Sequence, residues 1–156
     1  MSEPYTGGCA CGAIRYAMRR EPIIVHCCHC SWCQCETGSA FAINAVIEAS
    51  EVSVFGIDPE VIDTPSASGR GQLVARCPHC HVALWSHYSS SMVINYVRVG
   101  TMDDPSLYTP DIHIYTSTKL PWVTLPEGVR AYEAFYDTKA EWSEDALTRW
   151  MMATGL

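Results

Sequence analysis

The stretch GGCACG, at positions 7–12, places two cysteines one residue apart between glycines. A second pair stands far along the chain in CPHC, at positions 77–80. Glycines beside the first pair allow backbone amides to turn toward the sulfur atoms. Four thiolates supplied by two short loops form a typical structural zinc site, and such a site contributes directly to folding. We therefore expect one zinc ion to join distant strands through Cys9, Cys11, Cys77 and Cys80.

Two alternatives remain for this set. The four residues could be free buried cysteines, although two pairs with flanking turn residues seldom occur by chance. His79 or His81, inside and beside the second pair, could replace one of the cysteine ligands.

Between the two pairs, CHCSWC at positions 28–33 carries three cysteines without an obvious fourth ligand. Structural zinc sites have four protein ligands, whereas catalytic sites keep one position for water or substrate. The ligand counts therefore predict two zinc ions per chain, a structural one and a catalytic one held by Cys28, Cys30 and Cys33. The fourth position could be filled by water, by a thiol, or by a neighbour among His26, Cys27, His29 and Cys35.

A closed structural site that uses one of these neighbours is the alternative interpretation. Residues next to each other in an extended segment point to opposite faces, so Cys27 is expected to point away from Cys28. Cys35 is expected to fill space, and His29 to face solvent or support the ligands from behind. An open zinc site could activate a thiol or polarise a carbonyl, and both serve the addition of a thiol to an aldehyde.

The composition limits the class of protein. The chain has 156 residues, 48% of them hydrophobic and 17% charged, which is enough apolar material for a packed core. Its formal charge is −7 and it has ten Lys and Arg residues, so we expect no nucleic-acid partner. The apolar runs are short, and we expect no membrane segment and no signal peptide. Nine cysteines then favour metal binding in the reducing cytoplasm over disulfides.

Alternating and β-branched segments dominate the pattern and predict an all-β fold. We expect a loop at positions 65–71 and one short C-terminal helix, capped by Ser143 and ending at Thr154 before Gly155. Strands are predicted at positions 14–16, 23–26, 41–47, 52–55, 73–76, 82–88, 92–99 and 112–116.

The cysteine motifs and their surroundings resemble the glutathione-dependent formaldehyde-activating enzyme family, also called the CENP-V/GFA domain. The resemblance rests on GGCACGAIRY at 7–16, CHCSWC leading to TGSAF at 37–41, CPHC at 77–80, VGTMDDP at 99–105, HIY at 113–115 and Pro121-Trp122. It implies a single zinc domain over residues 1–156 with a β-tent fold, in which a metal holds curved antiparallel sheets together. It also implies the same division of the seven cysteines between a structural and a catalytic zinc.

The implied reaction joins glutathione and formaldehyde as S-hydroxymethylglutathione, which classes the enzyme as a carbon–sulfur lyase acting in reverse. Gln34, Cys35 and Glu36 stand where a basic pair is frequent in the family. His113 could face the catalytic zinc or pack within its sheet. The competing interpretations are a zinc-stabilised binding or adaptor module without catalysis and a thiol-rich metal buffer.

Overall fold

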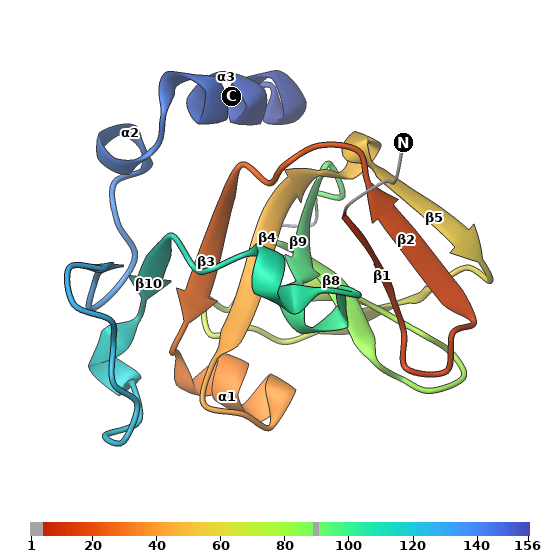
Figure 1. Cartoon of the computed structure of the whole chain (residues 1–156), viewed down its shortest axis with the longest axis horizontal. Helices are drawn as coiled ribbons and strands as arrows, with labels where there is room; N and C mark the ends of the chain where they lie inside the picture. The colour runs from red at the N-terminus through yellow and green to blue at the C-terminus, as the bar shows by residue number, and fades with distance from the viewer. Residues whose placement is uncertain (1–4, 89–90) are drawn as a thin grey trace.

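The computed structural model describes residues 5–88 and 91–156 (Figure 1). Residues 1–4 and 89–90, part of the range predicted as one zinc domain, lie outside the described residues. The described chain forms eleven strands in two sheets, which confirms the predicted all-β class. The strands are β1 (Thr6–Gly8), β2 (Ile14–Met18), β3 (Ile24–Cys28), β4 (Ala42–Glu48), β5 (Val52–Gly56), β6 (Glu60–Thr64), β7 (Gln72–Arg76), β8 (Ala83–Tyr88), β9 (Ile94–Arg98), β10 (Ile112–Ile114) and β11 (Arg130–Ala131).

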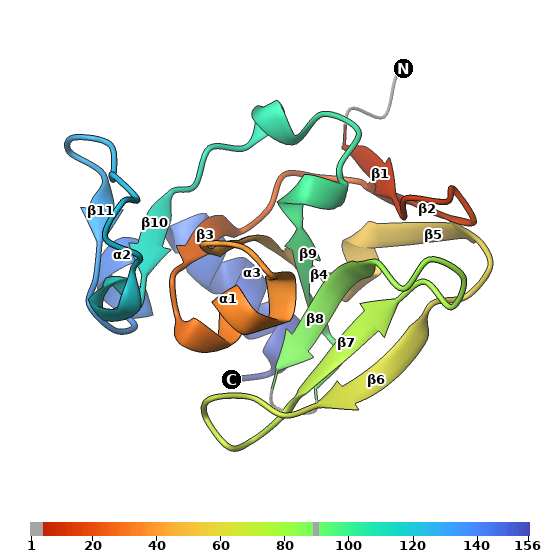
Figure 2. The same ribbon diagram turned by 90° about the horizontal axis from the view of Figure 1, so that it is seen from below.

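The small sheet has the order β1-β2-β5, and the large sheet has the order β11-β10-β3-β4-β9-β8-β7-β6. Almost all neighbouring strands are antiparallel, as predicted. The exceptions are at one edge of the large sheet, where β10 runs parallel to both β3 and β11. The parallel pairing brings the segment after residue 111 back beside β3, next to the three-cysteine motif (Figure 2).

The described residues form three α-helices where the sequence predicted one. The C-terminal helix α3 (Glu144–Thr154) is confirmed, with Ser143 as its N-cap and Gly155 in the left-handed conformation at its C-terminal end. Two further helices, α1 (Ser31–Thr37) and α2 (Thr138–Glu141), were not anticipated. α1 lies at the end of the sheet where β3 ends and β4 begins, whereas α3 lies at the opposite end of β4 (Figure 1).

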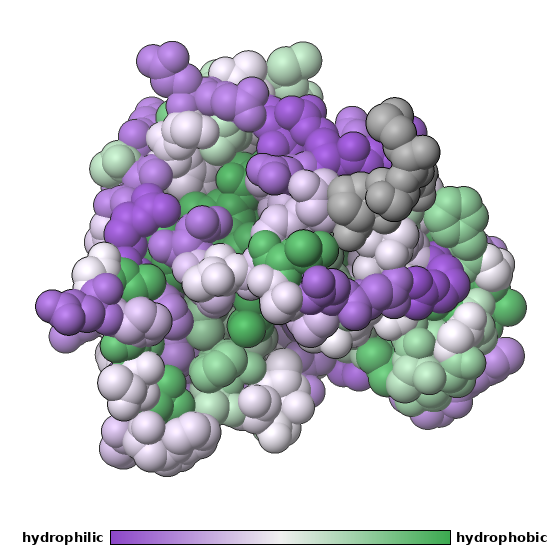
Figure 3. Space-filling view, in the orientation of Figure 1, coloured by the Kyte–Doolittle hydropathy of each residue, from purple (hydrophilic) through white to green (hydrophobic). Residues whose placement is uncertain are grey.

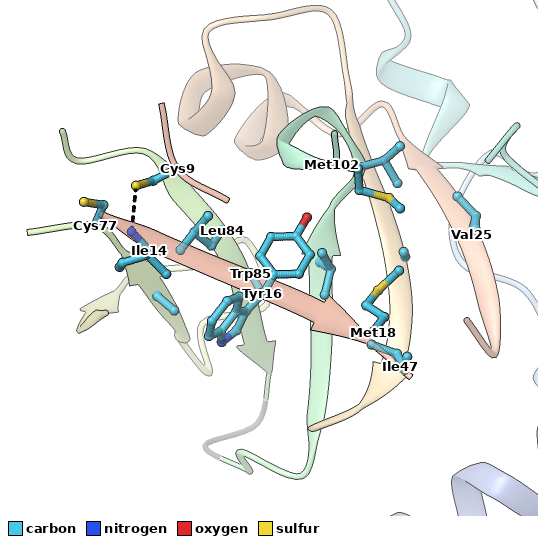
Figure 4. Packing of buried hydrophobic residues seen from close by; sticks show 14 residues of the cluster. Cys9, Ile14, Tyr16, Met18, Val25, Ile47, Cys77, Leu84, Trp85 and Met102 are labelled. Atoms are coloured by element: carbon cyan, nitrogen blue, oxygen red, sulfur yellow. Dashed lines mark hydrogen bonds between the residues drawn. The ribbon is translucent and has the colours of Figure 1, made fainter. Parts of the chain in front are cut away.

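The first hydrophobic core fills the space between the two sheets (Figure 4). Tyr16 of β2 meets Trp85 of β8 edge to face, with ring centroids 6.1 Å apart. Gly7 lies so close to Tyr16 and Thr101 that a Cβ there would collide with the tyrosine ring and the Thr101 carbonyl. Cys9 and Cys77 belong to this core, at one end of the labelled cluster in Figure 4.

The second core lies on the opposite face of the large sheet. It contains Cys28 and Cys33 together with apolar residues of β3, β4, β9 and β10, and Trp142 and Trp150 near α3 pack against it. The face in Figure 3 shows hydrophobic residues between hydrophilic ones rather than one continuous apolar surface. Because Cys9 and Cys77 belong to the first core and Cys28 and Cys33 to the second, the two cysteine sets predicted from the sequence lie in different cores.

Candidate metal centres

The four-cysteine set is assembled from the turn between β1 and β2 and the turn between β7 and β8. The sulfur atoms of Cys9, Cys11, Cys77 and Cys80 all lie within 4.8 Å of one another. Cys9 Sγ is 3.5 Å from Cys11 Sγ, and Cys11 Sγ is 3.7 Å from Cys77 Sγ. Four sulfur atoms each about 2.3 Å from one zinc ion are about 3.8 Å apart, so the observed spacing fits such an ion.

Backbone amides of both turns point toward these sulfur atoms. Ile14 N–H donates to Cys9 Sγ at 3.3 Å, and His79 N–H donates to Cys77 Sγ at 3.4 Å. Backbone hydrogen bonds from Val82 and Cys11 lower the pKa of the Cys80 thiol to about 6. Donors that favour the thiolate form are what a zinc ligand requires, because the metal binds the deprotonated sulfur.

The three-cysteine set is built around the N-terminus of α1. Cys28 ends β3, Cys30 is the N-cap of α1, and Cys33 lies in its first turn. Cys30 Sγ accepts a hydrogen bond of 3.3 Å from Cys33 N–H. The hydrogen bond from Cys28, followed by that from Cys33, holds the pKa of Cys30 far below its usual value. The helix was missed in the sequence, although Gly38 just after it is a frequent C-terminal helix signal.

No fourth Cys, His, Asp or Glu ligand atom within residues 5–88 and 91–156 joins the three sulfur atoms at similar distances. Cys27 points to the other face of β3, as its alternation with Cys28 predicts, and Cys35 is exposed on α1. Three soft sulfur ligands suit zinc, and the geometry leaves a coordination position free of such protein side chains. Both sets could therefore hold a metal ion.

A third cluster, formed by Cys27, His29 and His113, was not predicted. His29 Nε2 is 2.8 Å from His113 Nδ1 and 3.5 Å from Cys27 Sγ, and all three residues are buried. Of the two alternatives expected for His29, exposure to solvent is wrong, because its side chain is fully buried and also packs on Phe41. His113 pairs with Cys27 in the sheet and lies on that face, away from Cys28.

A cavity of about 400 Å³ opens over the three-cysteine set. Its wall is formed by residues of the large sheet, by the loop between β6 and β7, and by the segments that follow β10 and β11. The residues that line it are His26, Cys28, Cys30, Trp32, Cys33, Asn44, Ser66, Ala67, Ser68, Tyr88, Tyr96, Ile114, Tyr115 and Phe135. The predicted loop at 65–71 thus has a second role that its composition did not reveal.

His26 reaches this cavity from β3, two residues before Cys28 on the same face of the strand. Its Nε2 lies 2.6 Å from the hydroxyl of Tyr136, and burial lowers its pKa to about 4. His26 is therefore a neutral imidazole at neutral pH, fixed in orientation by a tyrosine from the C-terminal part of the chain.

Glu36 of α1 forms two ion pairs behind the site. Its carboxylate lies 2.8 Å from Arg76 Nη2 on β7 and 3.0 Å from Arg98 Nη2 on β9. Gln34 Nε2 donates to the backbone carbonyls of His29 and Thr118, each at 2.9 Å. Gln34 and Glu36 thus hold α1 in place.

The fold and the sites together define a β-sheet protein with two thiolate-rich candidate metal centres, one closed by four cysteines and one open toward a cavity. A family model described as glutathione-dependent formaldehyde-activating enzyme matches residues 4–118, so the chain belongs to that family. Residues 119–156, which include Phe135 and Tyr136, lie outside the match.

A comparison with curated proteins finds no match. Among solved structures, a crystal structure of a Rhodobacter sphaeroides protein is 19% identical, with a TM-score of 0.45 and with 63% of this chain and 87% of that chain covered. None of the helices within the described residues combines the length and the apolar character needed to cross a membrane.

Proposed function

We propose that the chain is a zinc-dependent enzyme that joins the sulfur of a small thiol to the carbonyl carbon of formaldehyde or a related small aldehyde. The same enzyme in reverse is a carbon–sulfur lyase of the S-(hydroxymethyl)glutathione synthase type. The observation that carries the proposal is the three-sulfur cluster, which opens into a cavity and lacks a fourth protein ligand of its kind among the described residues. Family membership supports glutathione as the first thiol to test.

In this reaction a carbon–sulfur bond forms, the carbonyl π electrons move to oxygen, and the proton of the thiol ends on that oxygen. A zinc ion held by Cys28, Cys30 and Cys33 would supply Lewis acidity and would lower the pKa of an incoming thiol. His26 lines the same cavity as these cysteines, and we assign to it the transfer of the proton. Tyr136 holds the imidazole ring in orientation.

We assign the structural role to the zinc held by Cys9, Cys11, Cys77 and Cys80. This set joins the β1–β2 turn to the β7–β8 turn and thus fastens the small sheet to the large one. Such a link supports the proposal that residues 1–156 act as one zinc domain with two zinc ions. The nine free cysteines support a reducing location, the cytoplasm.

The test is a comparison of Cys30→Ser with Cys35→Ser. Both cysteines belong to the α1 region, but Cys35 is exposed and stands apart from the cluster. NMR exchange spectroscopy measures how fast glutathione and formaldehyde interconvert with their adduct, and elemental analysis counts the zinc. We expect two zinc ions and accelerated exchange in the wild type and in Cys35→Ser, and one zinc ion without acceleration in Cys30→Ser. No acceleration by the wild type would favour the non-catalytic binding or adaptor module, and full acceleration in Cys30→Ser would exclude the three-cysteine set as the catalytic centre.

A further inference from the structure

Aromatic rings form a large part of the wall of the cavity over the three cysteines, and they belong to Trp32, Tyr88, Tyr96, Tyr115 and Phe135. Tyr88 and Tyr96 meet edge to face with centroids 4.6 Å apart, and Tyr115 and Phe135 lie 6.5 Å apart at a tilt. Tyr115 and Phe135 are also partly exposed, at 37% and 48%. Exposed aromatic rings beside a cavity of about 400 Å³ are typical of a binding site for a small ligand with an apolar body.

Tyr115 is held in an uncommon backbone conformation. Its φ of 54° and ψ of 41° lie in the left-handed region, which costs a non-glycine residue conformational energy. The surrounding hydrogen bonds maintain it, with Tyr115 N–H donating to Ala134 O at 3.1 Å. Strained residues of this kind gather at binding sites, and here the strain places a tyrosine in the cavity wall beside Phe135.

No Lys, Arg, Asp or Glu lines this cavity in the part of the chain that the structure describes. Arg98 lies behind Asn44. The guanidinium of Arg98 donates a hydrogen bond to the side-chain oxygen of Asn44. Glu36 and Ser86 accept from the same guanidinium at 3.0 Å, so Arg98 is already engaged. Glutathione carries two carboxylates at neutral pH. Among the described residues, the lining offers neutral donors such as Ser66, Ser68 and Asn44 but no cation, which is the stronger partner for a carboxylate that leaves water.

From this lining we infer, on the basis of the proposed function, that the preferred thiol is an uncharged one with an aromatic body rather than glutathione. Its sulfur would enter the open side of the three-cysteine cluster, and its ring would pack among Tyr115, Phe135 and Trp32. Phe135 belongs to residues 119–156, so this part of the wall lies outside the stretch that matches the family model.

The test uses the protein loaded with cobalt(II) in place of zinc, because a sulfur ligand on cobalt adds a near-ultraviolet charge-transfer band. Phenylmethanethiol and glutathione are titrated in parallel. We expect phenylmethanethiol to bind at least about tenfold more tightly. Phenylmethanol, which has the same ring without the sulfur, should leave the band unchanged.

Two variants separate ring packing from charge. Phe135→Ala should weaken phenylmethanethiol about fivefold or more and change glutathione less than twofold, whereas Trp122→Ala, a 73%-exposed aromatic outside the cavity lining, should change neither. Ala67→Lys, at the loop that lines the cavity, should strengthen the binding of glutathione several-fold.

Equal or tighter binding of glutathione by the wild type would overturn the inference while leaving the proposed function in place. If neither thiol changes the cobalt spectrum, the proposed function itself fails.

Discussion

At the scale of single residues, the contacts of Glu36 indicate whether the residues after Cys33 face a substrate or support the fold. Glu36, three residues after Cys33, has a side chain that is 7% exposed and bridges Arg76 and Arg98. The acidic residue therefore pairs with two arginines of the sheet. Because Arg98 is almost as buried as Glu36, removal of the carboxylate would leave a buried positive charge without its partner.

We predict that Glu36→Gln destabilises the fold by about 3 kcal/mol, the usual cost of breaking a buried ion pair from one side. Urea denaturation at neutral pH with zinc present measures this free energy of unfolding. Glu60→Gln, on an exposed residue of β6, is the matched control and should change stability by less than about 0.5 kcal/mol. A loss in Glu36→Gln no larger than in the control would contradict the structural role.

At the scale of elements, α3 is joined to β4 by a two-point ion pair. Arg149 Nε and Nη2 lie 2.8 Å and 2.6 Å from the two carboxylate oxygens of Glu48. Burial raises the pKa of Glu48, but the hydrogen bonds from Arg149, a backbone hydrogen bond and the charges of Arg149 and Arg20 together outweigh it, so the net shift of the pKa is downward. A segment outside the family match is thus tied to the strand that also supplies Asn44 to the cavity.

This pair predicts a pH dependence. Since the pKa of Glu48 is lower in the folded chain than its ordinary value of 4.5, the pair stabilises the fold above pH 4.5 and loses this effect as the pH falls through the folded pKa. Because this pair is about as buried as that of Glu36 with Arg98, we expect Glu48→Gln to cost about 3 kcal/mol at pH 7. Its stability should also fall less steeply below pH 4.5 than that of the wild type. Thermal unfolding followed between pH 3 and 7 tests this. Parallel curves for the two proteins would exclude the pair as a source of acid sensitivity.

At the scale of the whole molecule, the two cysteine sets differ in how much chain they join. The four-cysteine set joins turns of two sheets, whereas the three-cysteine set joins the end of β3 to the helix that follows it directly. The first set is therefore expected to stabilise the whole fold, and the second only the junction between β3 and α1. Substitution of a cysteine in the first set is therefore predicted to destabilise the protein more than substitution in the second set.

We predict that Cys80→Ser is poorly soluble or melts far below the wild type, since structural zinc commonly supplies folding energy outright. Cys30→Ser should melt within a few degrees of the wild type. Calorimetry with elemental analysis of the soluble fraction compares the two. Equal unfolding of both variants would make the second set structural as well.

The sequence alone predicted the elements whose signal is local. Alternation fixed β2, β3, β4 and β7 to within a few residues, and Ser143 and Gly155 marked the ends of α3. Cysteine spacing selected the same seven residues that the structure brings together as two sets, because ligands on one short loop are necessarily near each other. The strand at β6 was missed, as its exposed residues show no buried face.

Only the tertiary structure decided what surrounds these sets. The parallel pairing of β10 with β3 brings His113 to Cys27 and Tyr115 to the cavity, across more than 80 positions of sequence. Phe135 and the loop at 65–71 reach the same cavity from still other parts of the chain. Such contacts depend on how sheets close around a core rather than on local propensity, so no pattern within a short window contains them.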